Sequence, residues 1–257
     1  ASDVYKRQFL YFSQERIIFR PINLDENHAF QFKQNFEEVN ILSDEIELNA
    51  LHFKADSSIG VVVFYHGNGG NIDGWAPIQQ YYTSLGFDVV LLDYRGYGKS
   101  KGKYKNQTQF LKDAEAAYNY AKQFYQEPQI VVVGYSLGTS VASYVASKNQ
   151  PKQLILMAPF YSFEDLMRKS YPFIPSFILK YKIKTFEFIA TTTSPITIFQ
   201  GEDDEDTFLS SSLKLKKYLK PIDEYVMLSN QGHNGIHTNV KFQEKLKEIL
   251  QPSAVIE

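Results

Sequence analysis

The chain has 257 residues, of which 44% are hydrophobic and 22% are charged, and it contains no cysteine. This length and composition fit an ordinary globular protein with one large α/β domain or two small ones, and they exclude disulfides and thiolate metal sites. The formal net charge of −2 gives no electrostatic case for nucleic-acid binding, and no run of 18 apolar residues that could span a membrane occurs in the given sequence.

The first eight residues, ASDVYKRQ, resemble the translation of a transposon end used to prepare sequencing libraries. We therefore expect residues 1–8 to be a non-native leader, with a natural polar leader as the alternative, and exclude them from the fold prediction. Residues 9–12 are apolar and aromatic, as at the junction between a membrane anchor and a soluble domain. We expect the natural protein to continue upstream into such an anchor; the alternative is a short segment packed on the domain.

Short apolar runs alternate with helix-length stretches along the rest of the chain. Period-two alternation predicts an antiparallel strand pair at a sheet edge, at residues 39–42 and 46–53. Compact apolar runs predict six buried strands, at residues 60–65, 88–92, 129–133, 153–157, 195–199 and 224–228. Helices are predicted at residues 75–85, 108–124, 137–148, 210–219 and 240–250. This alternation predicts an α/β fold from residue 9 to 257: a mostly parallel, doubly wound sheet of about eight strands, helices on both faces, and ligands at the carboxyl ends of its strands.

Residues 160–189 interrupt the alternation and are rich in aromatic side chains. Helical core packing would explain them, and so would a small lid over a cleft. On the lid hypothesis the candidates for substrate contact are Phe160, Tyr161, Phe173 and Phe177.

Ser136 lies in the sequence Gly134-Tyr135-Ser136-Leu137-Gly138, directly after a predicted buried strand and before a predicted helix. This context is typical of a nucleophile elbow, a sharp strand-to-helix turn that requires small residues two positions before and after the serine. The turn presents the hydroxyl at a helix N-terminus, where backbone N–H groups stabilise negative charge. The sequence therefore predicts Ser136 as a nucleophile.

A serine hydroxyl needs a positioned base, and after such an elbow the acid and then the histidine follow in the chain. Only His233 and His237 lie beyond Ser136. His233 directly follows the last buried strand, so we predict it as the base and keep His237 as the alternative.

The acid is expected after the strand at residues 195–199, where residues 202–206 are all carboxylates. These residues could form only a solvated acidic turn. If one of them orients the histidine, its position alone does not choose among Asp203, Asp204 and Asp206.

Two backbone N–H groups are expected to form an oxyanion hole. The first belongs to Asn68, in the glycine-rich stretch at residues 66–71 that closes the strand at 60–65. The second belongs to Leu137, because the residue after the nucleophile supplies the other donor. His66 is expected to shape this turn and not to act as a base. No dinucleotide motif, complete P-loop or helical histidine pair occurs, so no cofactor and no metal ion are predicted.

At this point the sequence resembles the α/β-hydrolase superfamily of serine hydrolases, and within it the small abhydrolase-domain branch that includes membrane-anchored esterases and protein depalmitoylases. The resemblance runs from about residue 17 to 250, and its motifs are IIFRP (17–21), HGNGGN (66–71), DYRGYGKSKG (93–102), GYSLG (134–138), APF (158–160), SPITIFQG (194–201) and GHN (232–234). These motifs are specific evidence for the fold and for the Ser-His-acid set, but they are only weak evidence for the identity of the substrate.

The resemblance implies that the acid lies three residues after Gly201, which selects Asp204. A Val-Pro pair common after the acid in this family is absent here, and the resemblance also implies that the turn containing Arg95 and Lys99 is structural. The expected function is hydrolysis of a carboxylic ester or thioester of a small-molecule or lipid-like substrate through an acyl-enzyme on Ser136. The alternatives are a peptidase or amidase using the same residues, and a non-catalytic binding protein on the same fold. Contact with a membrane is expected only through the possible upstream anchor.

Overall fold

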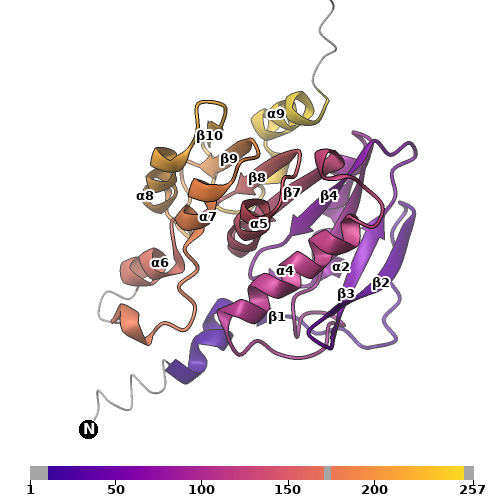
Figure 1. Cartoon of the computed structure of the whole chain (residues 1–257), viewed down its shortest axis with the longest axis horizontal. Coiled ribbons are helices and arrows are strands. Elements are labelled where there is room, and N and C mark those ends of the chain that lie inside the picture. Colours follow the sequence, from indigo (N-terminus) through magenta and orange to yellow (C-terminus); the bar gives the residue numbers. More distant parts are fainter. Residues whose placement is uncertain (1–10, 171–174, 252–257) are drawn as a thin grey trace, which may run out of the picture.

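An eight-stranded sheet forms the centre of the molecule in the computed structural model, which describes residues 11–170 and 175–251 (Figure 1). The suspected leader, the first two residues of the 9–12 stretch and Phe173 lie outside these residues. The strands are β2 (Phe36–Ser43), β3 (Ile46–Phe53), β4 (Gly60–Tyr65), β6 (Phe87–Leu92), β7 (Ile130–Tyr135), β8 (Gln153–Met157), β9 (Ile196–Gly201) and β10 (Glu224–Leu228). They are ordered β10-β9-β8-β7-β4-β6-β3-β2 across the sheet.

The sheet is mostly parallel, as predicted. Strands β6, β4, β7, β8, β9 and β10 pair in parallel, whereas β2 pairs antiparallel with β3, and β3 antiparallel with β6. β4, β6 and β7 are buried along their whole length, which explains their continuous apolar sequences. β2 at the edge has exposed residues, which explains its alternating pattern.

Helices cover both faces of the sheet and divide the core in two. α4 (Gln107–Ala121), α5 (Leu137–Lys148) and α7 (Thr185–Thr191) pack against the face to which Val61 and Val63 point. α2 (Ile72–Trp75), α3 (Gln80–Thr83) and α9 (Val240–Leu250) pack against the face to which Val62 and Phe64 point. This alternation along a single strand gives each face its own apolar layer.

Two predicted helices are broken. The helix predicted at residues 75–85 is divided by a 3-10 turn at Ala76–Gln79. Pro77 lies in this turn and cannot donate a backbone hydrogen bond. The helix predicted at residues 210–219 is a short α8 (Leu209–Ser212) followed by a 3-10 helix at Leu213–Tyr218. Three consecutive serines in α8 compete for backbone hydrogen bonds and disfavour a longer α-helix.

The 160–189 segment extends from the end of the sheet beside the start of the chain. It contains α6 (Phe163–Ser170), a 3-10 turn at Ser176–Ile178, and α7 (Figure 1). Residues 11–18 are helical, and Gln14 ties them to this segment through hydrogen bonds with the Ile178 carbonyl (2.9 Å) and the Lys180 N–H (2.8 Å). No helix in the described ranges has the length and apolar character needed to cross a bilayer.

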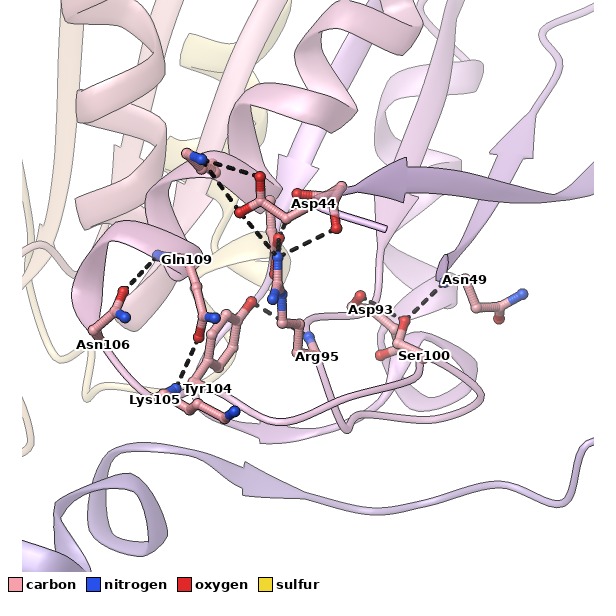
Figure 2. A network of polar contacts seen from close by, with 12 residues as sticks. Asp44, Asn49, Asp93, Arg95, Ser100, Tyr104, Lys105, Asn106 and Gln109 are labelled. Atoms are coloured by element: carbon pink, nitrogen blue, oxygen red, sulfur yellow. Dashed lines mark hydrogen bonds and ion pairs between the residues drawn. The ribbon is translucent and has the colours of Figure 1, made fainter. Parts of the chain in front are cut away.

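A buried ion pair holds the turn that follows β6 (Figure 2). The Arg95 guanidinium donates to both carboxylate oxygens of Asp113 on α4, each at 2.7 Å, and to the Ser43 carbonyl at 3.3 Å. Ser100 closes the other side, donating to the Asp93 carbonyl and accepting from the Asn49 N–H, each at 2.8 Å. Because both charges of the pair are buried and matched bidentately, Arg95 fixes the turn.

Candidate active site

Ser136 occupies a strained turn between β7 and α5. Its backbone has φ 52° and ψ −116°, a conformation that residues other than glycine rarely adopt. A Cβ at Gly134 would lie 2.6 Å from the Gly138 carbonyl oxygen, and a Cβ at Gly138 would lie 2.7 Å from the His66 carbonyl oxygen. The two glycines are therefore required by close backbone packing around the serine.

His233 lies in the loop after β10, with its ring against Ser136. Its Nε2 is 3.0 Å from the Ser136 Oγ. The loop is held from β7, because the Tyr135 hydroxyl donates to the His233 carbonyl at 2.7 Å. The alternative histidine, His237, instead packs its ring against Tyr81. The structure therefore brings His233, and not His237, to the serine.

Asp204 receives hydrogen bonds on both carboxylate oxygens. Oδ2 accepts from His233 Nδ1 (2.9 Å), Gln200 Nε2 (3.0 Å) and the Thr207 hydroxyl (2.8 Å). Oδ1 accepts from the backbone N–H groups of Asp206 (3.0 Å) and Thr207 (2.9 Å). Burial raises the pKa of Asp204, but the hydrogen bonds from His233 and Thr207 and the attraction to the imidazole outweigh it, so the pKa is lowered. The carboxylate is thus ionised at neutral pH although its side chain is fully buried.

The other two acids that the sequence left open have different positions. Asp203 is exposed, and its backbone N–H donates to the Gln231 carbonyl at 3.0 Å. Asp206 is also exposed and lines the cavity above the serine. Of the three, the structure places only Asp204 against the imidazole, in agreement with the spacing that the resemblance implies.

The two expected oxyanion donors flank the serine. Gly67 lies beside it: a Cβ at Gly67 would be 3.7 Å from the Ser136 Cβ, so the loop containing Asn68 passes close to the hydroxyl. Among the described residues, neither the Asn68 nor the Leu137 N–H donates to a protein acceptor. His66 is fully buried with its Nδ1 2.7 Å from the Gly67 carbonyl, which agrees with the expected structural role in this turn.

A cavity of about 510 Å³ opens above Ser136 and His233. Its apolar wall is formed by α6 and the end of the N-terminal helix, and by one indole: Ile17, Trp75, Phe163, Leu166 and Met167. Asn68, Gly69 and Arg20 also line the cavity and contribute polar groups. An apolar chain and a polar group attached to the serine can therefore be accommodated in different parts of one cavity.

Of the aromatic residues proposed for the lid, the three in the described ranges do not line this cavity. Phe160 is 2% exposed and belongs to the core, and Tyr161 stacks on Phe186 with ring centroids 4.4 Å apart. Phe177 is 77% exposed. The predicted segment does contribute to the cavity, but through Phe163, Leu166 and Met167 of α6. The wrong residues were selected because aromatic composition does not show on which face of a helix a side chain lies.

Four positioning residues were not identified from the sequence: Gln200, Thr207, Tyr135 and Trp75. The first two donate to Asp204, and Tyr135 fixes the histidine loop. The Trp75 indole N–H donates to the Gly69 carbonyl at 2.9 Å and steadies the oxyanion loop. Three of them carried a signal: Tyr135 lies inside the elbow motif, Gln200 lies inside SPITIFQG, and Thr207 lies where the family's Val-Pro pair is missing.

Sequence comparison matches residues 60–188, half of the chain, to the alpha/beta hydrolase fold family. The chain therefore belongs to the α/β-hydrolase family.

Curated relatives and solved structures agree with this membership. Protein bem46 of Schizosaccharomyces pombe is 28% identical over 188 residues, covering 68% of this chain and 62% of that protein. Lysophosphatidylserine lipase ABHD12 of Danio rerio is 30% identical over 172 residues, covering 58% of this chain and 44% of that protein. The chain thus spans only part of the length of these relatives. The Pyrococcus furiosus esterase Pf2001 superimposes with a TM-score of 0.73 at 18% identity, covering 91% of this chain and 96% of that one, which shows a shared fold.

Proposed function

We propose that the protein is a serine hydrolase that cleaves carboxylic ester or thioester bonds through an acyl-enzyme on Ser136. One observation carries the proposal: Ser136 Oγ, the two ring nitrogens of His233 and Asp204 Oδ2 form a continuous line, with separations of 3.0 and 2.9 Å. These are the distances over which a base can take the serine proton while a carboxylate orients the base.

The direction of proton transfer follows from the charge on Asp204. Its ionised Oδ2 can only accept, so the proton of the neutral His233 ring lies on Nδ1 and leaves Nε2 free to accept. Nε2 takes the proton of the Ser136 hydroxyl as the oxygen attacks the substrate carbonyl. It then returns the proton to the leaving alcohol or thiol, and water cleaves the acyl-enzyme by the same route.

We assign the backbone N–H groups of Asn68 and Leu137 to hydrogen bonding with the oxyanion that forms on the substrate carbonyl. Both lie beside the serine, and the Leu137 amide is the first of α5, where the helix dipole favours an anion. Donors fixed in the backbone need no reorganisation as the charge develops on the carbonyl oxygen. The loss of one such donor typically lowers kcat by about 10²- to 10³-fold.

Two observations favour esters over peptides as substrates. The apolar wall formed by α6 fits an acyl chain, whereas a peptide needs hydrogen-bonding groups along its backbone. Relatives and structural neighbours include proteins named as a lipase and as an esterase.

A fluorophosphonate probe and a panel of p-nitrophenyl esters and peptide amides test the proposal. We expect labelling at Ser136, ester turnover above peptide turnover, and loss of both labelling and turnover in Ser136→Ala, by about a millionfold for turnover. Ser147→Ala is the matched control, because this serine lies on the same helix and donates only to the Tyr144 carbonyl one turn back. Absence of labelling would favour a binding protein, and a clear preference for amides would favour a peptidase.

A further inference from the structure

A second cavity, of about 710 Å³, lies next to the first. One wall is the end of the N-terminal helix and the residues that follow it, from Glu15 to Glu26. The other wall is the turn after β6, from Arg95 to Tyr104, which the buried ion pair with Asp113 makes rigid (Figure 2). Its lining includes the apolar residues Phe19, Pro21 and Leu24, and it contains more cationic than acidic side chains.

Arg20 joins the two cavities, because it lines both. Its backbone N–H donates to the Asn68 carbonyl and to the Tyr97 hydroxyl oxygen, each at 2.9 Å. The Tyr97 hydroxyl in turn donates to the same Asn68 carbonyl at 2.7 Å. Arg20 also pairs with Gly69 in the short parallel ladder of β1 (Arg20–Pro21) and β5 (Gly69–Gly70). The guanidinium is therefore carried by a backbone that is bonded directly to the oxyanion loop.

The charges that line the second cavity do not cancel. Both acidic residues of the lining form ion pairs: Glu15 pairs with Lys180 at 3.1 Å, and Glu26 pairs with Lys101. Lys99 pairs with Glu38 at 2.9 Å, and Arg95 with Asp113. Within the described ranges, the cations of this lining that form no ion pair are Arg16, Arg20 and Lys103. Three unmatched positive charges in a concave site attract a multiply charged anion.

We propose that this second cavity binds a phosphate monoester carried on the alcohol portion of the substrate, and that Arg20 is the specificity-determining residue. The inference rests on the proposed ester hydrolysis at Ser136. A phosphate monoester carries up to two negative charges and three terminal oxygens, which match two guanidinium groups and one ammonium group. Asp206 lines the first cavity and repels an anion there, so the phosphate is held beyond Arg20.

The same arrangement assigns the two ends of the substrate. The acyl chain lies on the apolar wall of α6, and the scissile carbonyl lies between Ser136 and the Asn68 amide. The alcohol portion passes Arg20 into the second cavity. Because Arg20 and Asn68 share a hydrogen bond, binding of the phosphate and alignment of the oxyanion loop are mechanically connected.

Two substrates that differ only in the phosphate test this proposal: 1-octanoylglycerol and 1-octanoylglycerol 3-phosphate, followed by release of octanoate. We expect kcat/KM for the phosphorylated substrate to exceed that for the neutral one by about tenfold or more, since hydrogen bonds to charged groups are the strong ones. In Arg20→Gln this ratio falls by about tenfold, chiefly through KM, and Arg16→Gln and Lys103→Gln each lower it less. Raising the salt concentration also lowers the ratio, because the cations are exposed to solvent.

Lys122→Gln is the control for the loss of a surface charge. Lys122 follows the C-terminal end of α4, whose 15 residues place it about 22 Å from the end near the second cavity. In Lys122→Gln the ratio of kcat/KM for the phosphorylated substrate to kcat/KM for the neutral one stays at the wild-type value. Equal kcat/KM for the two substrates in the wild type, or a ratio that survives Arg20→Gln, would overturn the inference while ester hydrolysis stands. If neither substrate is cleaved and the fluorophosphonate does not label Ser136, the proposed function itself fails.

Discussion

Replacing Asp204 with asparagine turns one carboxylate oxygen into an NH2 group at a position where every neighbour donates. Oδ1 accepts from the backbone N–H groups of Asp206 and Thr207, at 3.0 and 2.9 Å. Oδ2 accepts from His233 at 2.9 Å, Gln200 at 3.0 Å and the Thr207 hydroxyl at 2.8 Å. In either orientation the new amide therefore places its NH2 against at least two donors.

The neighbours decide which orientation is adopted. Backbone N–H groups cannot become acceptors, whereas the groups around Oδ2 can. The Thr207 hydroxyl can rotate, Gln200 can flip because its Oε1 is buried without a partner among the described residues, and His233 can move its proton to Nε2. The asparagine oxygen therefore stays with the backbone, and Nε2–H then faces Ser136 and cannot accept its proton. The same loss of the correct histidine tautomer in the triad of a serine protease lowers kcat about 10⁴-fold, and we expect a loss of this order here.

Stability should change far less than turnover, because the groups around Oδ2 can pair again; we expect a loss of about 1–2 kcal/mol. The wild-type carboxylate, whose pKa is lowered in the folded state, stabilises the fold above the unfolded pKa of about 4, and this contribution disappears as the pH falls through the folded value. The melting temperature of the asparagine variant should accordingly depend less on pH below 4.

The assay is turnover of a p-nitrophenyl ester, with thermal melting as the measure of folding. Asp203→Asn is the matched control, because its side chain is exposed and does not line the cavity, and it should stay within about threefold of the wild type. Asp206→Asn, whose exposed side chain lines the cavity, should lose far less turnover than Asp204→Asn. Turnover of Asp204→Asn within tenfold of the wild type, or equal modest losses in all three variants, would refute the reasoning.

Three further predictions concern the fold and the acyl site. Gly138→Ala should abolish soluble folded protein, because its Cβ would overlap the backbone of β4, whereas Gly74→Ala, with open space at its Cβ, should melt at or above the wild-type temperature. Asp88 is buried, which raises its pKa, but hydrogen bonds from His52, a backbone N–H and a tyrosine hydroxyl lower it to about 2. Urea unfolding should therefore show Asp88→Asn to be less stable by up to about 2 kcal/mol at pH 7, with the difference lost between pH 5 and about 1; a pH-independent difference would contradict this. Leu166→Trp, which narrows the apolar wall, should move the ester preference toward shorter acyl chains in a kcat/KM series, and an unchanged optimum would place the acyl chain elsewhere.

The sheet could be predicted from the sequence because its strands are buried on both faces. Each predicted run coincides with a strand of the structure, and the main discrepancy is at the edge. There β2 begins at Phe36, three residues before the predicted start, because Glu37 and Glu38 face solvent and interrupt the apolar pattern. Helix lengths were less predictable, since a turn proline and a run of serines break helices whose apolar periodicity continues.

The site was partly predictable. The elbow and the order of the chain indicated Ser136 and His233. A row of carboxylates has no periodicity, so the acid was selected only by the spacing that the family resemblance implies, and the burial of Asp204 agrees with that selection. The cavity wall could have been inferred from a different pattern. Phe163, Leu166 and Met167 are spaced at i, i+3 and i+4, which places them on one face of a helix. The roles of Gln200 and Arg20 were not predicted: Gln200 lies inside SPITIFQG and Arg20 inside IIFRP, but neither motif shows which groups the side chain contacts.

The strand order also determines when during synthesis the protein can become reactive. β7, which carries the proposed nucleophile, lies between β4 and β8, so both neighbours of this strand have been synthesised once the chain extends through β8. The proposed acid and base follow β9 and β10, which in the described part of the chain are the last two strands in sequence and the last two at that edge of the sheet. A nascent chain therefore holds a serine without a base until His233 has emerged and β10 has docked on β9. The proposed hydrolysis therefore requires β10, and we expect a truncated chain that folds only as far as β8 to be inert toward esters.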